Sequence, residues 1–188
     1  MFSKTHNFKH KERKMNREKI KNISLAALFL ALGFILPMLT GQIPAIGKAL
    51  LPMHIPVFLC AFICGGRYGA GIGFVLPIFR SLLFSVPVMF PTAIAVAFEM
   101  AAYGIIAGAL YGFSKKKSVV ALYGSMIFAM IVGRVVRCAA EFVLLDFFGS
   151  GFVWKVFVSG VLLNSIPGIL LQLFVVPGVM IALKKAKF

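Results

Sequence analysis

Long apolar stretches with few or no charged residues make up most of the sequence. Residues 22–47 carry no charged side chain, and neither do residues 156–183. A helix needs about 20 apolar residues to cross a bilayer, so stretches of this length are typical of membrane spans. Overall, 61% of the 188 residues are hydrophobic and 13% are charged, whereas a soluble domain is about 45–50% apolar and about 25% charged. The composition excludes a soluble domain and predicts an all-α integral membrane protein.

Prolines, glycines and charged residues divide the apolar sequence into six expected transmembrane helices. The second is expected to be short, beginning near His54 and stopping at the Gly65-Gly66 pair, and the third to be broken by Pro77. We expect a basic tail over residues 1–19, in which residues 1–14 look unstructured, and one six-helix domain over residues 20–188. The expected spans are residues 23–39, 54–66, 68–85, 91–113, 118–145 and 153–183.

The formal net charge of +15 is explained by the orientation of these spans. Fifteen of the 20 lysine and arginine residues lie before Ile23, at Arg67, in residues 115–117 and at the C-terminus. Six spans place these four segments on one side, and basic loops face the cytoplasm. We therefore expect both termini to be cytoplasmic, in the plasma membrane of a prokaryote.

Five ionisable residues lie inside the expected spans: Arg80, Glu99, Arg134, Arg137 and Glu141. A charge in the middle of a bilayer costs at least about 2.5–3.5 kcal/mol, so each needs a partner or a water-filled cavity. Helical rise places Arg80, Glu99 and Arg134 in the outer half of the membrane. In one interpretation these residues only form structural ion pairs, Arg80 with Glu99 and Arg137 with Glu141. Arg134 is then left over, and a surplus arginine suits a ligand with a carboxylate or phosphate.

Uncharged polar residues lie in the same outer half. Gln42 follows the first span, His54 begins the second, Tyr103 lies in the fourth and Asn164 lies in the sixth. Two of them have a structural interpretation as well: His54 as the start of a helix, and Tyr103 as a core residue. The expected substrate-binding residues are Gln42, His54, Arg80, Glu99, Tyr103, Arg134, Arg137 and Asn164.

Small residues four positions apart form a second pattern. Ala27 and Ala31 lie in the first span, and glycines repeat at this spacing in the third and fourth spans. Such spacing lets helix backbones approach closely. For the glycines we expect packing inside the protein. The alanine pair, next to the basic tail, suits either internal packing or contact with another protein.

Several catalytic motifs are missing from the sequence. It contains no G-x-x-x-x-G-K-[ST] phosphate loop, no H-E-x-x-H metal motif and no G-x-S-x-G nucleophile elbow. The three cysteines lie in apolar runs and are interpreted as packing residues, not as metal ligands. We expect neither an enzyme nor a metal or cofactor in this chain.

The pattern as a whole resembles the substrate-binding S component of energy-coupling factor (ECF) vitamin transporters. The resemblance runs from about residue 16 and rests on length, span number, the Ala27-x-x-x-Ala31 pair, and the stretches LPMHIP (51–56), CGGRYG (64–69) and RSLLF (80–84). It implies capture of a vitamin from outside, with residues 40–53 as a lid and the alanine pair against a transmembrane coupling subunit. Two partner ATPase subunits would use ATP, which agrees with the missing phosphate loop.

The substrate does not follow from this resemblance. The surplus arginine favours an anionic vitamin, with pantothenate first. The alternative is a stand-alone transporter of a small organic anion in which Glu99 and Glu141 relay protons. A structural subunit without a ligand is a third possibility.

Overall fold

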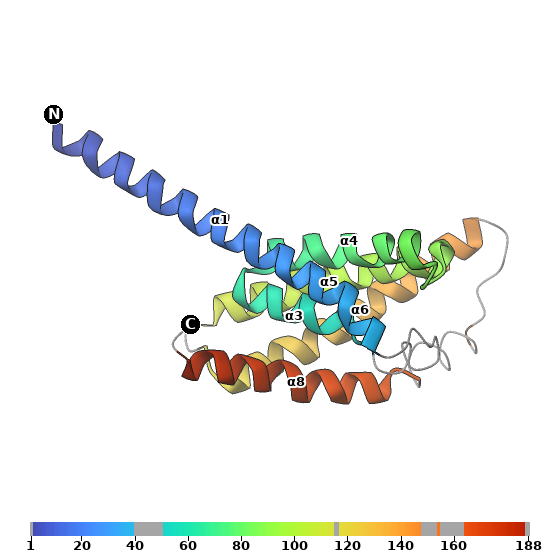
Figure 1. Cartoon of the computed structure of the whole chain (residues 1–188). Helices are drawn as coiled ribbons and strands as arrows, with labels where there is room; N and C mark the ends of the chain where they lie inside the picture. The colour runs from blue at the N-terminus through green and yellow to red at the C-terminus, as the bar shows by residue number, and fades with distance from the viewer. Residues whose placement is uncertain (1, 40–50, 115–116, 148–153, 155–163, 187–188) are drawn as a thin grey trace.

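The computed structural model describes residues 2–39, 51–114, 117–147, 154 and 164–186, and within these ranges it contains helices and no strands (Figure 1). Most of the helices run roughly along a common direction and form one bundle. The helices are α1 (Phe2–Leu39), α3 (His54–Ile63), α4 (Gly66–Phe84), the short π-helix η1 (Met89–Ala93), α5 (Ile94–Phe113), α6 (Val119–Phe147) and α8 (Ile166–Lys185).

Helix α1 is longer than the sequence analysis expects, because the basic tail is helical from Phe2 onward. The expectation that residues 1–14 are unstructured is therefore wrong. Lysine, arginine, glutamate and methionine fill much of this segment, and all of them are good helix formers. The basic part continues the apolar span as one helix that projects beyond the bundle (Figure 1).

Helix α3 lies in the centre of the bundle. It begins at His54 and ends at Ile63, as expected for a short second span, and nine of its ten residues are buried. It packs against α1, α4, α5 and α8. Ten residues rise only about 15 Å, so α3 alone is too short to cross a bilayer. It is a core element of the bundle.

Helices α4 and α5 pack closely through their glycines. A Cβ atom added at Gly104 would lie 2.3 Å from the carbonyl carbon of Gly69, and one at Gly73 would lie 2.5 Å from the carbonyl oxygen of Met100. This confirms internal packing for the repeated glycines at 69, 73, 104 and 108, whereas a Cβ atom added at Gly112, the last of the repeat, would meet nothing within 4 Å. The expected break at Pro77 is wrong, since α4 continues through it, as transmembrane helices often do where neighbouring groups compensate for the missing N–H donor.

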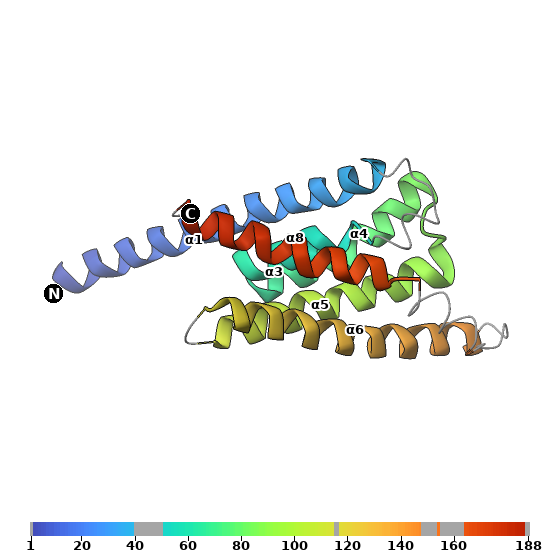
Figure 2. The same ribbon diagram turned by 90° about the horizontal axis from the view of Figure 1, so that it is seen from below.

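Within the described ranges, four helices are long and apolar enough to cross a membrane: Met15–Met38, Met89–Phe113, Val119–Phe147 and Ile166–Lys185. Helices α5 and α6 run side by side along one edge of the bundle, and the C-terminal end of α8 lies at the same end of the bundle as the N-terminal half of α1 (Figure 2). The basic segment of α1, Lys117 and the end of α8 consequently lie at one end of the bundle. The side chain of Lys184 donates a hydrogen bond to the backbone carbonyl of Lys117.

Candidate functional site

Glu99 is the centre of a buried network of charges between α5 and α6. Its side chain is fully buried, and its two carboxylate oxygens face different arginines of α6. Oε1 lies 3.0 Å from Nη1 of Arg134, and Oε2 accepts a hydrogen bond of 3.1 Å from Nη1 of Arg137. Both arginines are mostly buried, so these contacts are the kind that a charge needs inside a membrane.

The network extends to neighbouring polar residues. Nε of Arg137 donates to Glu141 over 3.0 Å, which confirms the expected pair within one helix. The hydroxyl of Tyr103 donates to Glu99 over 2.6 Å. Nη2 of Arg134 donates to the hydroxyl of Ser165, directly before α8, over 2.9 Å. The two arginines and two glutamates therefore form a charge-balanced group that links α5, α6 and the start of α8.

The expected pairing of Arg80 with Glu99 is wrong, and so is the expectation that Arg134 is left over. Glu99 binds Arg134 and Arg137 instead of Arg80. The reason lies in the contact between α5 and α6. A Cβ atom at Gly133 would lie 2.0 Å from the ring of Tyr103, so this glycine admits the tyrosine and allows the α5 face with Glu99 to approach the arginines next to it.

Of the three arginines inside the expected spans, Arg80 of α4 is the one without a carboxylate partner among the described residues. It is only 2% exposed. Its Nη1 donates to the backbone carbonyl of Phe34 near the end of α1 over 3.1 Å, and its guanidinium lies 5.4 Å from the ring centre of Phe84. Its Nε is buried without a hydrogen-bond partner in the described structure. The surplus of one positive charge expected from the sequence is thus present, but at Arg80.

His54 lies deep in the bundle at the start of α3. It is fully buried with its ring 5.5 Å from the ring of Tyr103, and neither ring nitrogen has a hydrogen-bond partner among the described residues. A buried polar group without a partner is costly in a native protein. Its place beside a buried charge network makes His54 a candidate binding residue.

Gln172 of α8 is a buried polar residue that the sequence analysis missed. Its Nε2 donates to the carbonyl of Leu51 over 3.5 Å, three residues before His54. It connects α8 to the chain that leads into α3. Gln172 is a polar amide inside the uncharged stretch of residues 156–183, as Asn164 is, and this is the sequence signal that could have identified it.

The remaining expected site residues are less enclosed. Asn164 lies in an exposed turn before α8, so the expectation that it lies inside the sixth span is wrong. The adjacent Ser165 is buried. Gln42 lies outside the described residues. Ala27 and Ala31 lie on an exposed face of α1. The described residues contain no group of three histidine, cysteine or acidic side chains that could hold a metal ion.

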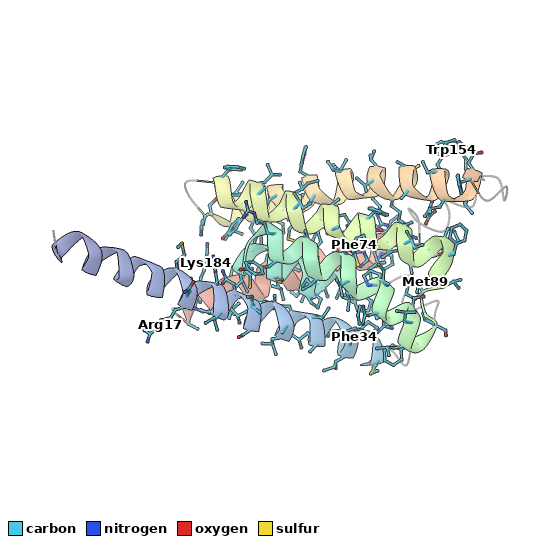
Figure 3. The ribbon with its side chains drawn as sticks, turned by 90° about the horizontal axis from the view of Figure 1, so that it is seen from above. Arg17, Phe34, Phe74, Met89, Trp154 and Lys184 are labelled. Carbon is cyan, nitrogen blue, oxygen red and sulfur yellow. The ribbon has the colours of Figure 1, made fainter. Side chains whose placement is uncertain are left out.

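The two ends of the bundle differ in chemistry. Met89 and Trp154 lie at the end opposite Arg17 and Lys184 (Figure 3). The chain runs from the basic end to the opposite end in α1, α4 and α6, and back again in α5 and α8. Arg80 and the Glu99 network lie in the parts of their helices toward the end with Met89.

Comparison with known proteins identifies the family. A family model described as "ECF transporter, substrate-specific component" matches residues 21–180. No curated protein and no solved structure gives a significant match. The match covers all the helices except the basic start of α1 and the last residues of α8, and together with the four long apolar helices it indicates a multi-pass membrane protein. The chain therefore belongs to the family of substrate-specific components of ECF transporters.

Proposed function

We propose that this chain is the subunit of an ECF importer that captures a vitamin carrying an anionic group, with pantothenate as the first candidate. The observation that carries the substrate class is Arg80, which is buried and has only a backbone carbonyl as hydrogen-bond acceptor among the described residues. An unpaired buried charge is expensive. A carboxylate or phosphate of the ligand would supply the missing partner through charge-assisted hydrogen bonds.

The charge balance of the Glu99 network supports the same assignment. Arg134 and Arg137 already face carboxylates, so they offer hydrogen bonds and no surplus charge. Nε of Arg134 and both ring nitrogens of His54 have no hydrogen-bond partner in the described structure and could contact uncharged polar groups of the ligand. The proposed substrate-binding residues remain Gln42, His54, Arg80, Glu99, Tyr103, Arg134, Arg137 and Asn164.

Transport would depend on partner proteins. The family implies association with an ECF module, and we propose a transmembrane coupling subunit that contacts Ala27 and Ala31 and two ATPases that hydrolyse ATP. In this proposal the chain is neither an enzyme nor a cofactor-binding protein. It comprises a basic tail over residues 1–19 and a membrane domain over residues 20–188, which crosses a prokaryotic plasma membrane six times with both termini in the cytoplasm.

The test is ligand binding by the purified chain. Mass spectrometry of the small molecule released on denaturation identifies the substrate, and calorimetry then measures its affinity for wild type, Arg80→Gln and the exposed control Arg67→Gln. We expect Arg80→Gln to weaken binding about 30-fold or more, since a charge-assisted hydrogen bond contributes about 2 kcal/mol, and Arg67→Gln to leave it unchanged. Unchanged affinity in Arg80→Gln, or a copurifying cation, would exclude the anionic substrate.

The alternative is a stand-alone, proton-coupled transporter. In such a protein Glu99 and Glu141 would have to exchange protons, yet both are engaged with arginines. The two functions differ in uptake by liposomes that contain only this chain. We expect no accumulation of the identified ligand under a proton gradient, and accumulation would support the alternative.

A further inference from the structure

A cavity of about 420 Å³ lies at the basic end of the bundle, far from the Glu99 network. Along α5, Tyr111 of this cavity is twelve residues from Glu99, a rise of about 18 Å. The cavity is lined by residues of α1, α3, α5 and α8 and by Lys117, it is partly open to the surface, and its volume is typical of small-molecule sites. It is independent of the substrate site proposed above.

The cavity combines an apolar floor with a basic rim. The floor includes Leu25, Phe62 and Met180, and the rim includes Lys21, Lys117 and Lys184. Glu18 is the acidic residue in the lining, so the lining carries a surplus of two positive charges. A floor and a rim of this kind are complementary to a molecule with an anionic head and an apolar body.

Lys184 is positioned by its neighbours. Its ammonium group donates to the carbonyl of Lys117 and lies 5.9 Å from the centre of the Tyr111 ring. These contacts attach the end of α8 to the segment between α5 and α6 and fix one positive charge at the edge of the cavity. A third donor site of the ammonium group can still face a ligand.

The position of the cavity across the thickness of the membrane indicates the kind of ligand. Charged residues stop at Lys21 on α1 and resume at Lys184 on α8, so the cavity lies where both helices pass from apolar to charged sequence. This is the level of the lipid headgroups. Basic pockets between transmembrane helices on the cytoplasmic side suit anionic phospholipid headgroups.

We propose that this cavity binds the phosphate of an anionic phospholipid of the cytoplasmic leaflet. Lys21, Lys117 and Lys184 surround the phosphate, and the first part of an acyl chain lies over Leu25 and Met180. The site would anchor the basic end of the bundle to the membrane surface and join α1 to α8.

Native mass spectrometry of the full chain in detergent tests this proposal. The probes are phosphatidylglycerol, zwitterionic phosphatidylcholine, and the water-soluble headgroup glycerophosphoglycerol. The pocket variant is Lys21→Gln with Lys184→Gln. The matched control is Lys19→Gln with Lys185→Gln, which changes the exposed neighbours on the same two helices by the same charge. Thermal unfolding in detergent without lipid verifies that both variants fold.

We expect wild type and control to retain phosphatidylglycerol in preference to phosphatidylcholine, and the pocket variant to retain at least about tenfold less phosphatidylglycerol. Equal losses in the two double variants would show general charge attraction and overturn the site. Displacement of the lipid by an equimolar amount of glycerophosphoglycerol would overturn the lipid assignment in favour of a soluble phosphate compound.

Discussion

The buried charges between α5 and α6 depend on Glu99. It is the residue that both Arg134 and Arg137 share, and it also accepts the hydroxyl proton of Tyr103 in a hydrogen bond. Removal of one partner from a buried ion pair costs about 3–5 kcal/mol, because a buried charge is left without compensation. The network therefore contributes to the specificity of helix packing as well as lining the proposed site.

Substitution of Glu99 tests this structural role. We expect Glu99→Gln to lower the free energy of unfolding by about 3 kcal/mol, because Arg134 loses its carboxylate partner and Arg137 loses one of two. Glu141→Gln is the control, since Glu141 forms an ion pair with one arginine, Arg137, among the described residues and is slightly more exposed. Unfolding by titration with a denaturing detergent measures both. Equal losses in the two variants would contradict the central position of Glu99.

Replacement of Arg80 is not expected to lower the free energy of unfolding in the way that replacement of Glu99 does. Arg80 has no carboxylate partner in the described structure, so its replacement removes a desolvated charge without leaving another one unpaired.

The sequence could identify Arg80 and Glu99 as buried charges, because any ionisable residue in an apolar run stands out. It could not pair them, because pairing depends on which helix faces meet.

Among the helices, α1 has the most exposed surface available for a partner. Ala27 and Ala31 are one turn apart and both exposed, whereas Ala26 and Phe29 are buried against the bundle. A face of small side chains lets another helix approach closely. The structure thus leaves the alanine pair free of internal packing, in contrast to Gly104 and Gly73.

A bulky residue on this face is expected to separate binding from transport. Ala27→Trp should abolish ATP-driven uptake in liposomes with the complete importer and leave ligand affinity unchanged, because the face lies away from the Glu99 network and Arg80. Leu28→Trp is the control, since Leu28 is exposed about a quarter turn away on the same helix. Normal uptake by Ala27→Trp would place the coupling surface elsewhere.

Across the whole molecule, charge is divided between the two ends of the bundle. Arg17, Lys117 and Lys184 lie at one end, and Met89 and Trp154 lie at the other. The excess of lysine and arginine at one end is the pattern that orients membrane proteins with that end in the cytoplasm. The proposed substrate site and the proposed phospholipid site then face opposite sides of the membrane.

Reporter fusions test this orientation. We expect green fluorescent protein fused after Lys117 or after Phe188 to fluoresce, and alkaline phosphatase at the same positions to be inactive, because each reporter works on only one side of the membrane. A phosphatase fusion after Val88, in the segment between α4 and η1, should be active. The reverse pattern at any of these positions would exclude six spans with cytoplasmic termini.

The sequence by itself determined the membrane class, the positions of most helices, the family resemblance and the surplus of one buried positive charge. These are properties of local composition. The length of an apolar stretch, the positions of prolines and glycines, and the number of charges can each be read from the sequence without knowing how the helices pack. The tertiary structure decided that the surplus lies at Arg80, that Arg134 binds Glu99, and that His54 is buried beside Tyr103. Those outcomes depend on how helices rotate and approach one another, as where Gly133 admits Tyr103. The residues in these contacts lie 30 to 49 positions apart along the chain, so the sequence does not show that they meet until the helices are packed.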